Sequence, residues 1–273
     1  MNYIIYNGAI VSESDFMPGL SNRAFLYGDG LFETMMLRKG VISFFSDHFE
    51  RITEGLSVLG MKASAEWKKS FVEEKILELC LKNNYKDKAR IKLLVFRKPG
   101  GLVTPASTGF DYIVLLADYS QVLETKEKTI FCDEVMICKT SYSKYKTCNF
   151  LPYIQASIYK SKMKVDEVII SDAFGNIAEC TTSNIFWGKD NVLFTPSTDT
   201  GCIAGIMRKQ IIKTSKDIGI NIEEGEYVKK DLLDADFAFT SNSSGLSSLI
   251  YVEGTKFDGN ASIYQQIASL IVI

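Results

Sequence analysis

This chain of 273 residues is 46% hydrophobic, 23% charged and 12% aromatic, which is enough material for one large domain or two ordinary ones. Its 31 lysines and arginines nearly balance 33 aspartates and glutamates, giving a formal net charge of −2, which argues against a nucleic-acid surface. The longest apolar runs, residues 91–96 and 112–117, are far shorter than the roughly 20 residues of a membrane span. Because the N-terminus also lacks a secretory signal pattern, we expect a soluble, cytoplasmic protein.

Six cysteines and one histidine narrow the possible chemistry. The cysteines form no CxxC pair, and a chain of this length does not need disulfides, so we expect reduced thiols. The single histidine, His48, excludes any mechanism built on two histidines, including His-pair metal sites. Its surroundings predict a helix start, where a histidine usually takes part in local packing or hydrogen bonding. We therefore assign no metal ligands and expect chemistry based on lysine, carboxylate or a cofactor.

Strands and helices are both predicted for the first half, which has the pattern of a small α/β domain covering residues 1–119. Asn7-Gly8 predicts a hairpin turn, because both central positions of a type I′ turn need positive φ. Gly60 ends a helix whose apolar residues recur at spacings of three and four. The predicted elements are strands at residues 3–6 and 9–11, a strand that follows Gly30, helices at 49–59 and 67–81, and strands at 90–97 and 111–119.

A polar connector, residues 120–128, predicts the boundary to a larger second domain, residues 120–273. Pro152 suits the first turn of a helix, where no backbone N–H is needed. Phe174-Gly175-Asn176 and Lys189-Asp190-Asn191 have the turn chemistry of a meander. The predicted elements are a strand at residues 130–138, a helix after Pro152, strands at 166–172, 177–182, 184–187 and 192–195, a helix at 205–218, strands at 236–241 and 246–252, and a helix at 262–272.

Two glycine-rich turns are candidates for phosphate binding. Gly28-Asp29-Gly30 lacks the third glycine of a dinucleotide fingerprint, and a plain tight turn explains it better. The loop over residues 201–208 leads into a helix, whose free N–H groups and positive dipole end could hold a phosphate monoester. Since most helix starts bind nothing, this second feature is weak when it is taken alone.

A long ordered string in the second half is more specific. It runs Glu179-Cys180-Thr181-Thr182-Ser183-Asn184-Ile185-Phe186, then Leu193-Phe194-Thr195, then Ile203-Ala204-Gly205-Ile206-Met207-Arg208. In its elements and their spacing it resembles the signature of the class IV aminotransferases, the fold-type IV pyridoxal-phosphate enzymes. Lys144-Tyr145-Lys146-Thr147-Cys148-Asn149 is similar to the family's Schiff-base segment, and Tyr27 to Glu33 and His48 to Arg51 are similar to its N-terminal stretch. The resemblance spans about residues 23–257.

The resemblance implies a role for each matching residue. Lys146 would bind pyridoxal 5'-phosphate through its amine, which must be neutral to react. Glu179 would face the ring nitrogen, where a carboxylate keeps the ring protonated. The phosphate needs cationic and N–H donors. The substrate needs a pocket that is lined by side chains of the protein. The family's pattern assigns Arg51, Ile206, Met207, Ser241 and Asn242 to the phosphate, and Tyr27, Phe32 and Arg97 to the substrate.

Plainer explanations exist for the same residues. Lys144 would point the same way as Lys146 from a strand, and the resemblance alone ranks Lys146 above it. Arg51 or Lys146 could be solvated side chains, and Glu179 an outward strand residue. Ser241 and Asn242 could form a simple turn, while Tyr27 and Phe32 could belong to the core.

The implied fold is a mixed α+β or α/β protein of two domains, with a β-rich pseudo-barrel in the larger, cofactor-holding C-terminal domain. The implied activity is transfer of an amino group from a small amino acid to a 2-oxo acid through a lysine aldimine, in a homodimer. The aminodeoxychorismate lyase reaction, which yields 4-aminobenzoate and pyruvate, is the alternative. Ser241-Asn242-Ser243-Ser244-Gly245 departs from the branched-chain enzymes and weakens that branch. A catalytically silent binding homologue is a further alternative.

Overall fold

The computed structural model describes residues 2–119 and 123–271. Within them the chain forms two compact units: unit 1 holds residues 2–119 together with Tyr145–Asn149, and unit 2 holds residues 123–144 and 150–271. The domain boundary predicted at residue 120 lies outside the described residues. The predicted division also assigns Tyr145–Asn149 to the second domain, whereas these residues pack with unit 1. This short excursion of the chain carries Lys146.

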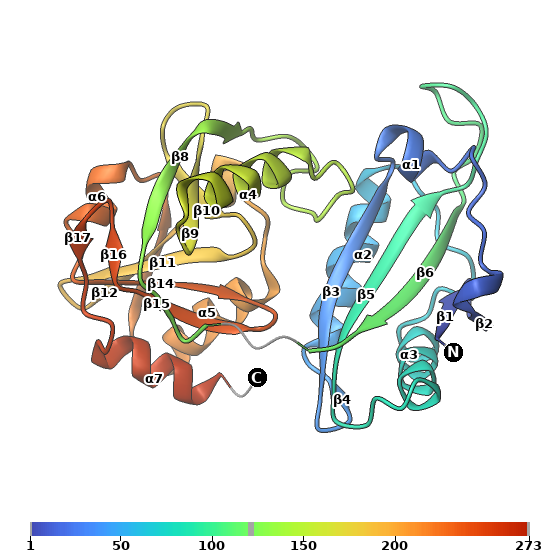
Figure 1. The fold of residues 1–273 in the computed structure, drawn as a ribbon, viewed down its shortest axis with the longest axis horizontal. Coiled ribbons are helices and arrows are strands. Elements are labelled where there is room, and N and C mark those ends of the chain that lie inside the picture. The colour runs from blue at the N-terminus through green and yellow to red at the C-terminus, as the bar shows by residue number, and fades with distance from the viewer. Residues whose placement is uncertain (1, 120–122, 272–273) are drawn as a thin grey trace. The chain divides into compact units, whose positions relative to one another are not determined.

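Unit 1 is built on a six-stranded antiparallel sheet with the order β2-β1-β6-β5-β3-β4 (Figure 1). Its strands are β1 (Tyr3–Tyr6), β2 (Ala9–Ser12), β3 (Gly30–Arg38), β4 (Val41–Ile42), β5 (Lys88–Arg97) and β6 (Phe110–Ala117). Its helices are α1 (Arg23–Tyr27), α2 (Phe45–Val58) and α3 (Lys69–Lys82), and a 3-10 turn covers Glu13–Asp15.

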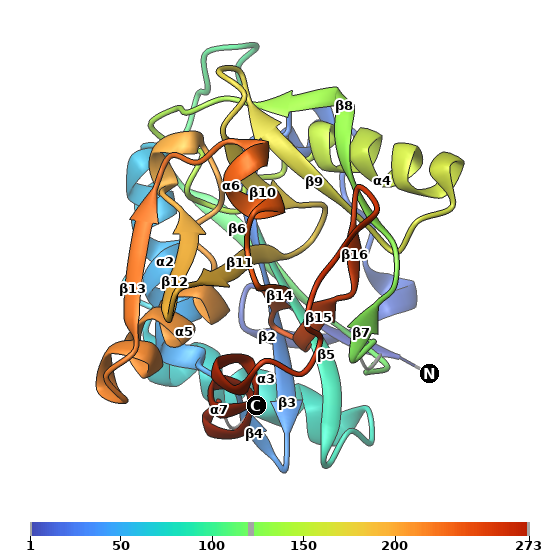
Figure 2. The same cartoon turned by 90° about the vertical axis from the view of Figure 1, so that its left-hand side faces the viewer.

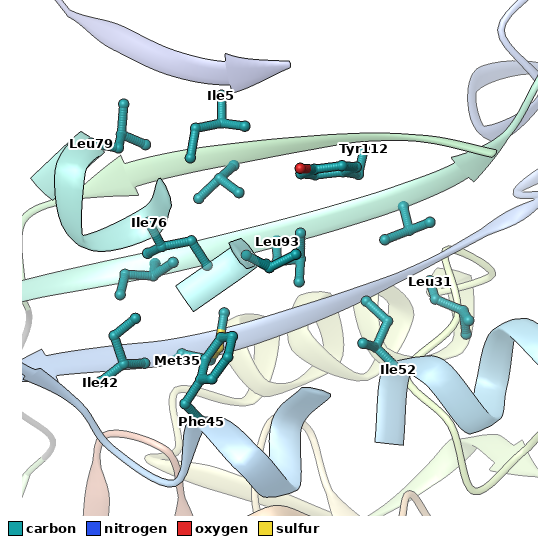
Figure 3. Close-up of a cluster of buried hydrophobic side chains, with 14 of the residues drawn as sticks. Ile5, Leu31, Met35, Ile42, Phe45, Ile52, Ile76, Leu79, Leu93 and Tyr112 are labelled. Carbon is teal, nitrogen blue, oxygen red and sulfur yellow. The ribbon is translucent and has the colours of Figure 1, made fainter. Parts of the chain in front are cut away.

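One face of this sheet carries the core of unit 1. Helices α2 and α3 both contribute to it, because their apolar stripes contain residues such as Ile52 and Ile76 that are almost completely buried. Figure 3 shows these side chains in one cluster with Met35 of β3, Leu93 of β5 and Phe45 at the start of α2. Burial of such side chains stabilises the fold by about 1.5 to 3 kcal/mol each.

Local backbone preferences explain the turns that the sequence predicted. Asn7 and Gly8 have φ of 48° and 83°, as a type I′ turn between β1 and β2 requires. Gly60 has φ of 67° just after α2, so the predicted glycine stop is confirmed. The short helix α1 was not predicted, because Arg23-Ala24-Phe25-Leu26-Tyr27 is too brief to show a helical period.

Unit 2 contains two sheets, with the orders β10-β9-β8-β16-β17 and β13-β12-β11-β14-β15-β7. Their strands are β7 (Thr125–Lys126), β8 (Thr129–Ile137), β9 (Glu167–Asp172), β10 (Ile177–Cys180), β11 (Asn184–Lys189), β12 (Val192–Pro196), β13 (Asn221–Gly225), β14 (Phe237–Asn242), β15 (Gly245–Leu249), β16 (Tyr251–Val252) and β17 (Thr255–Lys256). The helices are α4 (Leu151–Met163), α5 (Ile206–Asp217), α6 (Lys229–Leu233) and α7 (Ser262–Leu270), with a 3-10 turn at Thr198–Thr200.

The main core of unit 2 draws side chains from both of its sheets. Phe131 and Ile169 come from the five-stranded sheet, and Trp187 and Leu249 come from the six-stranded sheet. A second cluster, around Ala156, packs α4 along β8 and β9 (Figure 2). The two sheets are therefore held together largely by apolar contacts, which are strong but have little directional preference.

Most predicted elements of the second half are confirmed within a few residues. Pro152 stands in the first turn of α4. The four strands of the predicted meander form as β9 to β12, but they are two hairpins and not one meander: β9 pairs with β10 in the five-stranded sheet, and β11 pairs with β12 in the six-stranded sheet. The chain crosses from one sheet to the other between Cys180 and Asn184. The strand predicted for residues 246–252 is divided between β15 and β16, which belong to different sheets. The last helix ends at Leu270, and residue 272 of its predicted range lies outside the described residues. Among the described helices, none is both long and apolar enough to cross a bilayer.

Candidate functional site

Lys146 lies in unit 1, on a segment that pairs with the first residues of β3. The Phe32 N–H donates to the Lys146 carbonyl oxygen over 2.8 Å, and the Cys148 N–H donates to the Gly30 carbonyl oxygen over 2.9 Å. These bonds form an isolated antiparallel bridge between Leu31 and Thr147 at the edge of β3. The backbone at Lys146 and just after it is therefore fixed, although no regular element was predicted there.

Two close approaches hold this segment in place. A Cβ at Gly30 would stand 2.6 Å from the Val95 carbonyl oxygen, so β3 can begin there only with glycine. A Cβ at Gly55 of α2 would stand 3.3 Å from Cδ1 of Tyr145, which shows how tightly the helix packs on the segment. Tyr145 is itself buried in the core of unit 1. The anchored tyrosine fixes the position of Lys146, the next residue along the chain.

The ring of Phe32 lies beside two amines. Lys146 Nζ and Lys92 Nζ are each 5.0 Å from the centroid of this ring, and both lysines are partly buried. Lys144, the competitor of Lys146 in the sequence, belongs to unit 2 and is exposed. Sequence reasoning missed Lys92. The alternation of polar and apolar residues from Lys88 to Leu93 is the signal that could have found it, because in a strand it puts Lys92 on the face opposite the core.

Arg51 takes part in a buried cluster around Glu33 of β3. Its Nε donates to Glu33 Oε1 over 2.7 Å, and Nδ1 of His48 lies 2.7 Å from Glu33 Oε2. Burial alone would raise the pKa of Glu33, but the Arg51 guanidinium and His48 outweigh it and hold this pKa at about 2. Glu33 is thus a carboxylate that orients Arg51, and His48 is a hydrogen-bonding partner as predicted.

The guanidinium group of Arg97 is engaged by hydrogen-bond acceptors inside unit 1. Its Nε donates to Asp29 Oδ2 over 2.9 Å and its Nη2 donates to the Leu59 carbonyl oxygen over 2.6 Å. Arg23 donates to the same Asp29 oxygen and to the carbonyl oxygen of Leu102. Burial tends to raise the pKa of Asp29, but the two guanidinium groups lower it overall. These bonds make Arg97 a poor candidate for the substrate carboxylate.

The other two predicted substrate residues differ in exposure. Tyr27 ends α1, and 46% of it is exposed, so it does not belong to the core. The guanidinium carbon of Arg23 lies 4.8 Å from the centroid of its ring. Phe32 is partly buried beside the two lysines. Of the three predicted residues, Phe32 is the one that the structure brings to Lys146 within unit 1.

Glu179 lies in unit 2, on β10, and is buried. Tyr153 of α4 donates its hydroxyl proton to Glu179 Oε1 over 2.6 Å, and the Ile203 N–H donates to the same oxygen over 3.1 Å. Burial, together with the Glu179 carboxylate, raises the pKa of Tyr153, which therefore remains a donor. Glu179 is not the outward strand residue of the plainer explanation; its carboxylate is held in one orientation.

The start of α5 is packed directly on Asn184. A Cβ at Gly205 would stand 2.1 Å from Asn184 Oδ1, so this position accepts only glycine. Asn184 in turn donates from Nδ2 to the carbonyl and hydroxyl oxygens of Ser241, over 2.9 and 3.1 Å. Ile206 and Met207 form the first turn of α5, where helix geometry supplies no internal acceptor for the N–H groups. The helix start and the buried Ser241 hydroxyl are thereby tied to one asparagine.

Asn242 closes the end of β14. Its Nδ2 donates to Ser183 Oγ over 3.1 Å, and its Oδ1 accepts the Ser244 N–H over 2.8 Å. The second bond is typical of an Asx turn, so the turn explanation applies to Asn242. Ser241, in contrast, is a buried strand residue.

The structure therefore collects the predicted residues in two groups. Unit 1 holds Lys146 and Phe32 together and fixes Arg51 on Glu33. In unit 2 a continuous set of contacts leads from Glu179 through Ile203 to the start of α5, and on through Asn184 to Ser241.

Comparison with known proteins identifies the family. The family model described as amino-transferase class IV matches residues 30–248, which is most of the chain. This chain belongs to the class IV aminotransferases. The aminodeoxychorismate lyase of Bacillus subtilis (strain 168) is 30% identical over 246 residues, covering 88% of this chain and 83% of that protein. The D-alanine aminotransferase of Bacillus licheniformis is 22% identical over 267 residues, covering 94% and 91%.

Solved structures agree with this assignment of the fold. The branched-chain amino acid aminotransferase of Escherichia coli superimposes with a TM-score of 0.90 at 24% identity, covering 97% of this chain and 92% of that one. The T.th. branched-chain enzyme, solved with pyridoxamine 5'-phosphate, gives a TM-score of 0.88 at 20% identity, covering 98% and 92%. The predicted fold is confirmed, and as a class IV aminotransferase family member the chain is an enzyme of a pyridoxal-phosphate-dependent family.

Proposed function

We propose that this class IV enzyme binds pyridoxal 5'-phosphate through Lys146 and transfers the amino group of a small amino acid to a 2-oxo acid. The observation that carries the proposal is the placement of the Lys146 amine against the Phe32 ring, on a backbone that is fixed by β3. A lysine that repeatedly forms and breaks a bond to the same cofactor atom must return to the same position each time, which requires such a fixed backbone. Lys144, the competitor in the sequence, is an exposed residue of unit 2.

The chemistry of the donor set fits the cofactor. Arg51, the first-turn N–H groups of Ile206 and Met207, and the Ser241 hydroxyl are the types of donor that a phosphate monoester takes. Asn242 is assigned to the same phosphate group. The close approach at Gly205 supports this assignment, because a side chain there would push α5 away from Asn184 and Ser241. We assign Glu179 to the ring nitrogen, since Tyr153 and the Ile203 N–H already fix the orientation of its carboxylate.

The proposed reaction needs one group that moves a proton and one that holds the substrate. When bound, the cofactor supplies an electron sink that stabilises negative charge on the α carbon of the substrate. The Lys146 amine would take up the α proton of the amino-acid substrate, and in the second half-reaction it would deliver a proton to the α carbon of the new amino acid that forms from the 2-oxo acid. We assign the substrate's α-carboxylate to the Lys92 ammonium group in place of Arg97, because Lys92 lies against the same ring as Lys146. Phe32 and Tyr27 would line the side chain of the substrate.

We further propose that the enzyme is a cytoplasmic homodimer. All six cysteines lie in the described ranges and are free thiols, which suits a reducing compartment. In unit 1, α1 exposes 77% of Phe25, 50% of Leu26 and 46% of Tyr27. Contiguous exposed apolar side chains of this kind are typical of an interface between proteins. Light scattering coupled to size exclusion would show a mass of twice 30.6 kDa; a monomer at micromolar concentration would contradict the proposal.

The aminodeoxychorismate lyase reaction is the second candidate. The observation in its favour is the 30% identity to the lyase of Bacillus subtilis over most of both chains. The same Lys146 would abstract the α proton in either reaction, so the residues named above do not separate the two.

The test begins with the cofactor. Purified protein should be yellow, and borohydride reduction should attach the cofactor to a peptide that contains Lys146. Lys146→Ala should abolish both the attachment and the activity, whereas Lys144→Ala, the matched control, should retain them. Protein that stays colourless after incubation with pyridoxal 5'-phosphate would contradict the proposal and favour a catalytically silent binding homologue.

The reaction is then decided by parallel assays. The enzyme is given D-alanine with 2-oxoglutarate, L-leucine with 2-oxoglutarate, and aminodeoxychorismate without an oxo acid. We expect amino transfer in one of the first two assays. Release of aminobenzoate without a 2-oxo acid, and no transfer in the other assays, would replace the aminotransferase proposal by the lyase.

A further inference from the structure

A buried ion pair in unit 2 lies outside the residues assigned so far. Lys126 Nζ of β7 is 2.7 Å from Glu167 Oε2 at the start of β9, and both residues are buried. Burial would raise the pKa of Glu167, but the Lys126 ammonium, with two hydrogen bonds, lowers it overall. Glu167 is therefore held as a carboxylate within a buried ion pair, in a place where apolar side chains of similar size are often at least as stabilising.

Each member of the pair also binds one threonine hydroxyl. Lys126 Nζ donates to Thr240 Oγ1 over 2.9 Å, and Thr181 donates its hydroxyl proton to Glu167 Oε1. Both threonines are buried. Thr240 is the residue immediately before Ser241, and Thr181 follows Glu179 by two positions. The charges are thus connected to the two strands that carry the proposed cofactor residues of unit 2.

The ion pair crosses between the two sheets of that unit. Lys126 and Thr240 belong to the six-stranded sheet, which also carries Ser241. Glu167 belongs to the five-stranded sheet, which also carries Glu179, and Thr181 stands just beyond the end of its strand β10. Apolar packing elsewhere between the sheets opposes their separation but resists sliding weakly, because it is not directional. Charge-assisted hydrogen bonds, in contrast, fix both distance and direction.

We propose that Lys126 and Glu167 are positioning residues for the cofactor. They act through Thr181 and Thr240 to set the separation between the Glu179 carboxylate and the Ser241 hydroxyl. This separation must match the span from the ring nitrogen to the phosphate of one rigid ligand, which an apolar contact would leave loosely defined. The inference rests on the proposed function, because it assigns these two ends of the ligand to Glu179 and Ser241.

The test compares the ion pair with an apolar replacement. Lys126→Met/Glu167→Leu removes both charges, so neither partner stays buried and unpaired. Urea denaturation of the cofactor-free protein measures folding, titration with pyridoxal 5'-phosphate measures affinity, and visible circular dichroism measures how the bound cofactor is oriented. We expect near-native folding and an altered dichroism band, with affinity reduced by about tenfold, by analogy with the loss seen when residues that orient the ligands of a metal ion are removed.

Single threonine variants provide a second route that does not depend on the double variant folding. Thr240→Val keeps the shape of the side chain but removes the hydroxyl, and Thr240→Ser keeps the hydroxyl. The same matched pair is made at Thr181. We expect each valine variant to lower cofactor affinity and change the dichroism band, and each serine variant to restore both. If the valine and serine variants have the same cofactor affinity and the same dichroism band, the inference is overturned.

The outcomes separate this inference from the proposed function. If the unaltered protein binds no pyridoxal 5'-phosphate, the proposed function fails and this inference fails with it. If the unaltered protein binds it and the double variant does so with the same affinity and the same dichroism, the ion pair has only a structural role. In that case the proposed function stands and the inference alone is overturned.

Discussion

Two buried carboxylates of this enzyme, Glu33 in unit 1 and Glu167 in unit 2, are each held by a cation and one further side chain, and the two arrangements differ in origin. Glu33 of unit 1 is held by His48 and Arg51, which are three residues apart on the single helix α2. Glu167 of unit 2 is held by Lys126 from 41 positions earlier and by Thr181 from 14 positions later. One cluster is local to a helix and a strand; the other joins two sheets.

The comparison shows two ways in which a fold can orient a charged group. Around Glu33, the cation to be oriented, Arg51, is itself a proposed phosphate ligand, and the carboxylate acts on it directly. Around Glu167, the charges are one step removed and act on the backbone through threonine. Loss of Glu33 should therefore affect two side chains of one helix, His48 and Arg51, whereas loss of Lys126 or Glu167 should affect the packing of two sheets. The predictions below test this difference.

The largest effect is expected from Lys126→Met alone. It leaves Glu167 charged and buried without its cation, which should lower the free energy of unfolding by about 3 to 5 kcal/mol. Urea denaturation of the cofactor-free protein measures this loss, and the Lys126→Met/Glu167→Leu variant is the control that should recover most of it. A loss below about 1 kcal/mol for the single variant would mean that Glu167 takes up a proton or finds another partner at little cost.

A smaller effect is expected from Glu33→Gln. The amide retains one acceptor for Arg51 but no longer neutralises it, so the unfolding free energy should fall by about 1 to 3 kcal/mol. Cofactor affinity should fall as well, because Arg51 loses its orientation. Thr34→Val, at the next and less buried position of β3, is the control for a merely structural disturbance of the strand. Unchanged cofactor affinity in Glu33→Gln would show that Arg51 does not need Glu33.

The pH dependence of stability should carry the signature of Glu33. Its pKa is lowered from 4.5 in the reference state to about 2 in the folded protein. The folded state therefore binds fewer protons than the unfolded state between these values, so the stability contributed by Glu33 is complete above about pH 4.5 and is lost as the pH falls towards 2. Unfolding free energies of the unaltered protein and Glu33→Gln should converge over this range. If the difference in unfolding free energy between the two proteins stays constant from about pH 5 to about pH 2, Glu33 is not the source of this pH dependence.

The smallest effect is expected at an exposed ion pair. Lys162 and Glu134 of unit 2 are linked over 3.1 Å, but most of both side chains is exposed. Exposed pairs of this type contribute little, because solvent screens the attraction and two flexible side chains must be ordered. Lys162→Ala should leave both unfolding and cofactor affinity unchanged within experimental error. A clear destabilisation would undermine the distinction between buried and exposed pairs on which the comparison depends.

The sequence predicted those features of the fold that depend on neighbouring residues. Asn7-Gly8, Gly60 and Pro152 act through their own backbone angles, so their turn, helix end and helix start could be assigned without a structure. Apolar periodicity located α2 and most of the strands for the same reason. The ordered string from Glu179 to Arg208 was enough to indicate the family, because its residue types and spacings belong to a contiguous part of the chain.

The tertiary structure alone decided which distant residues meet. It placed Tyr145–Asn149 in unit 1, paired Arg97 with Asp29, and brought Lys92 to the ring beside Lys146. It also assembled the Lys126–Glu167 pair, whose members give no signal in the sequence. Such contacts follow from sheet order and register, and these are set by the burial of whole elements. A one-residue change of register would redirect every side chain of a strand, which no local pattern can determine.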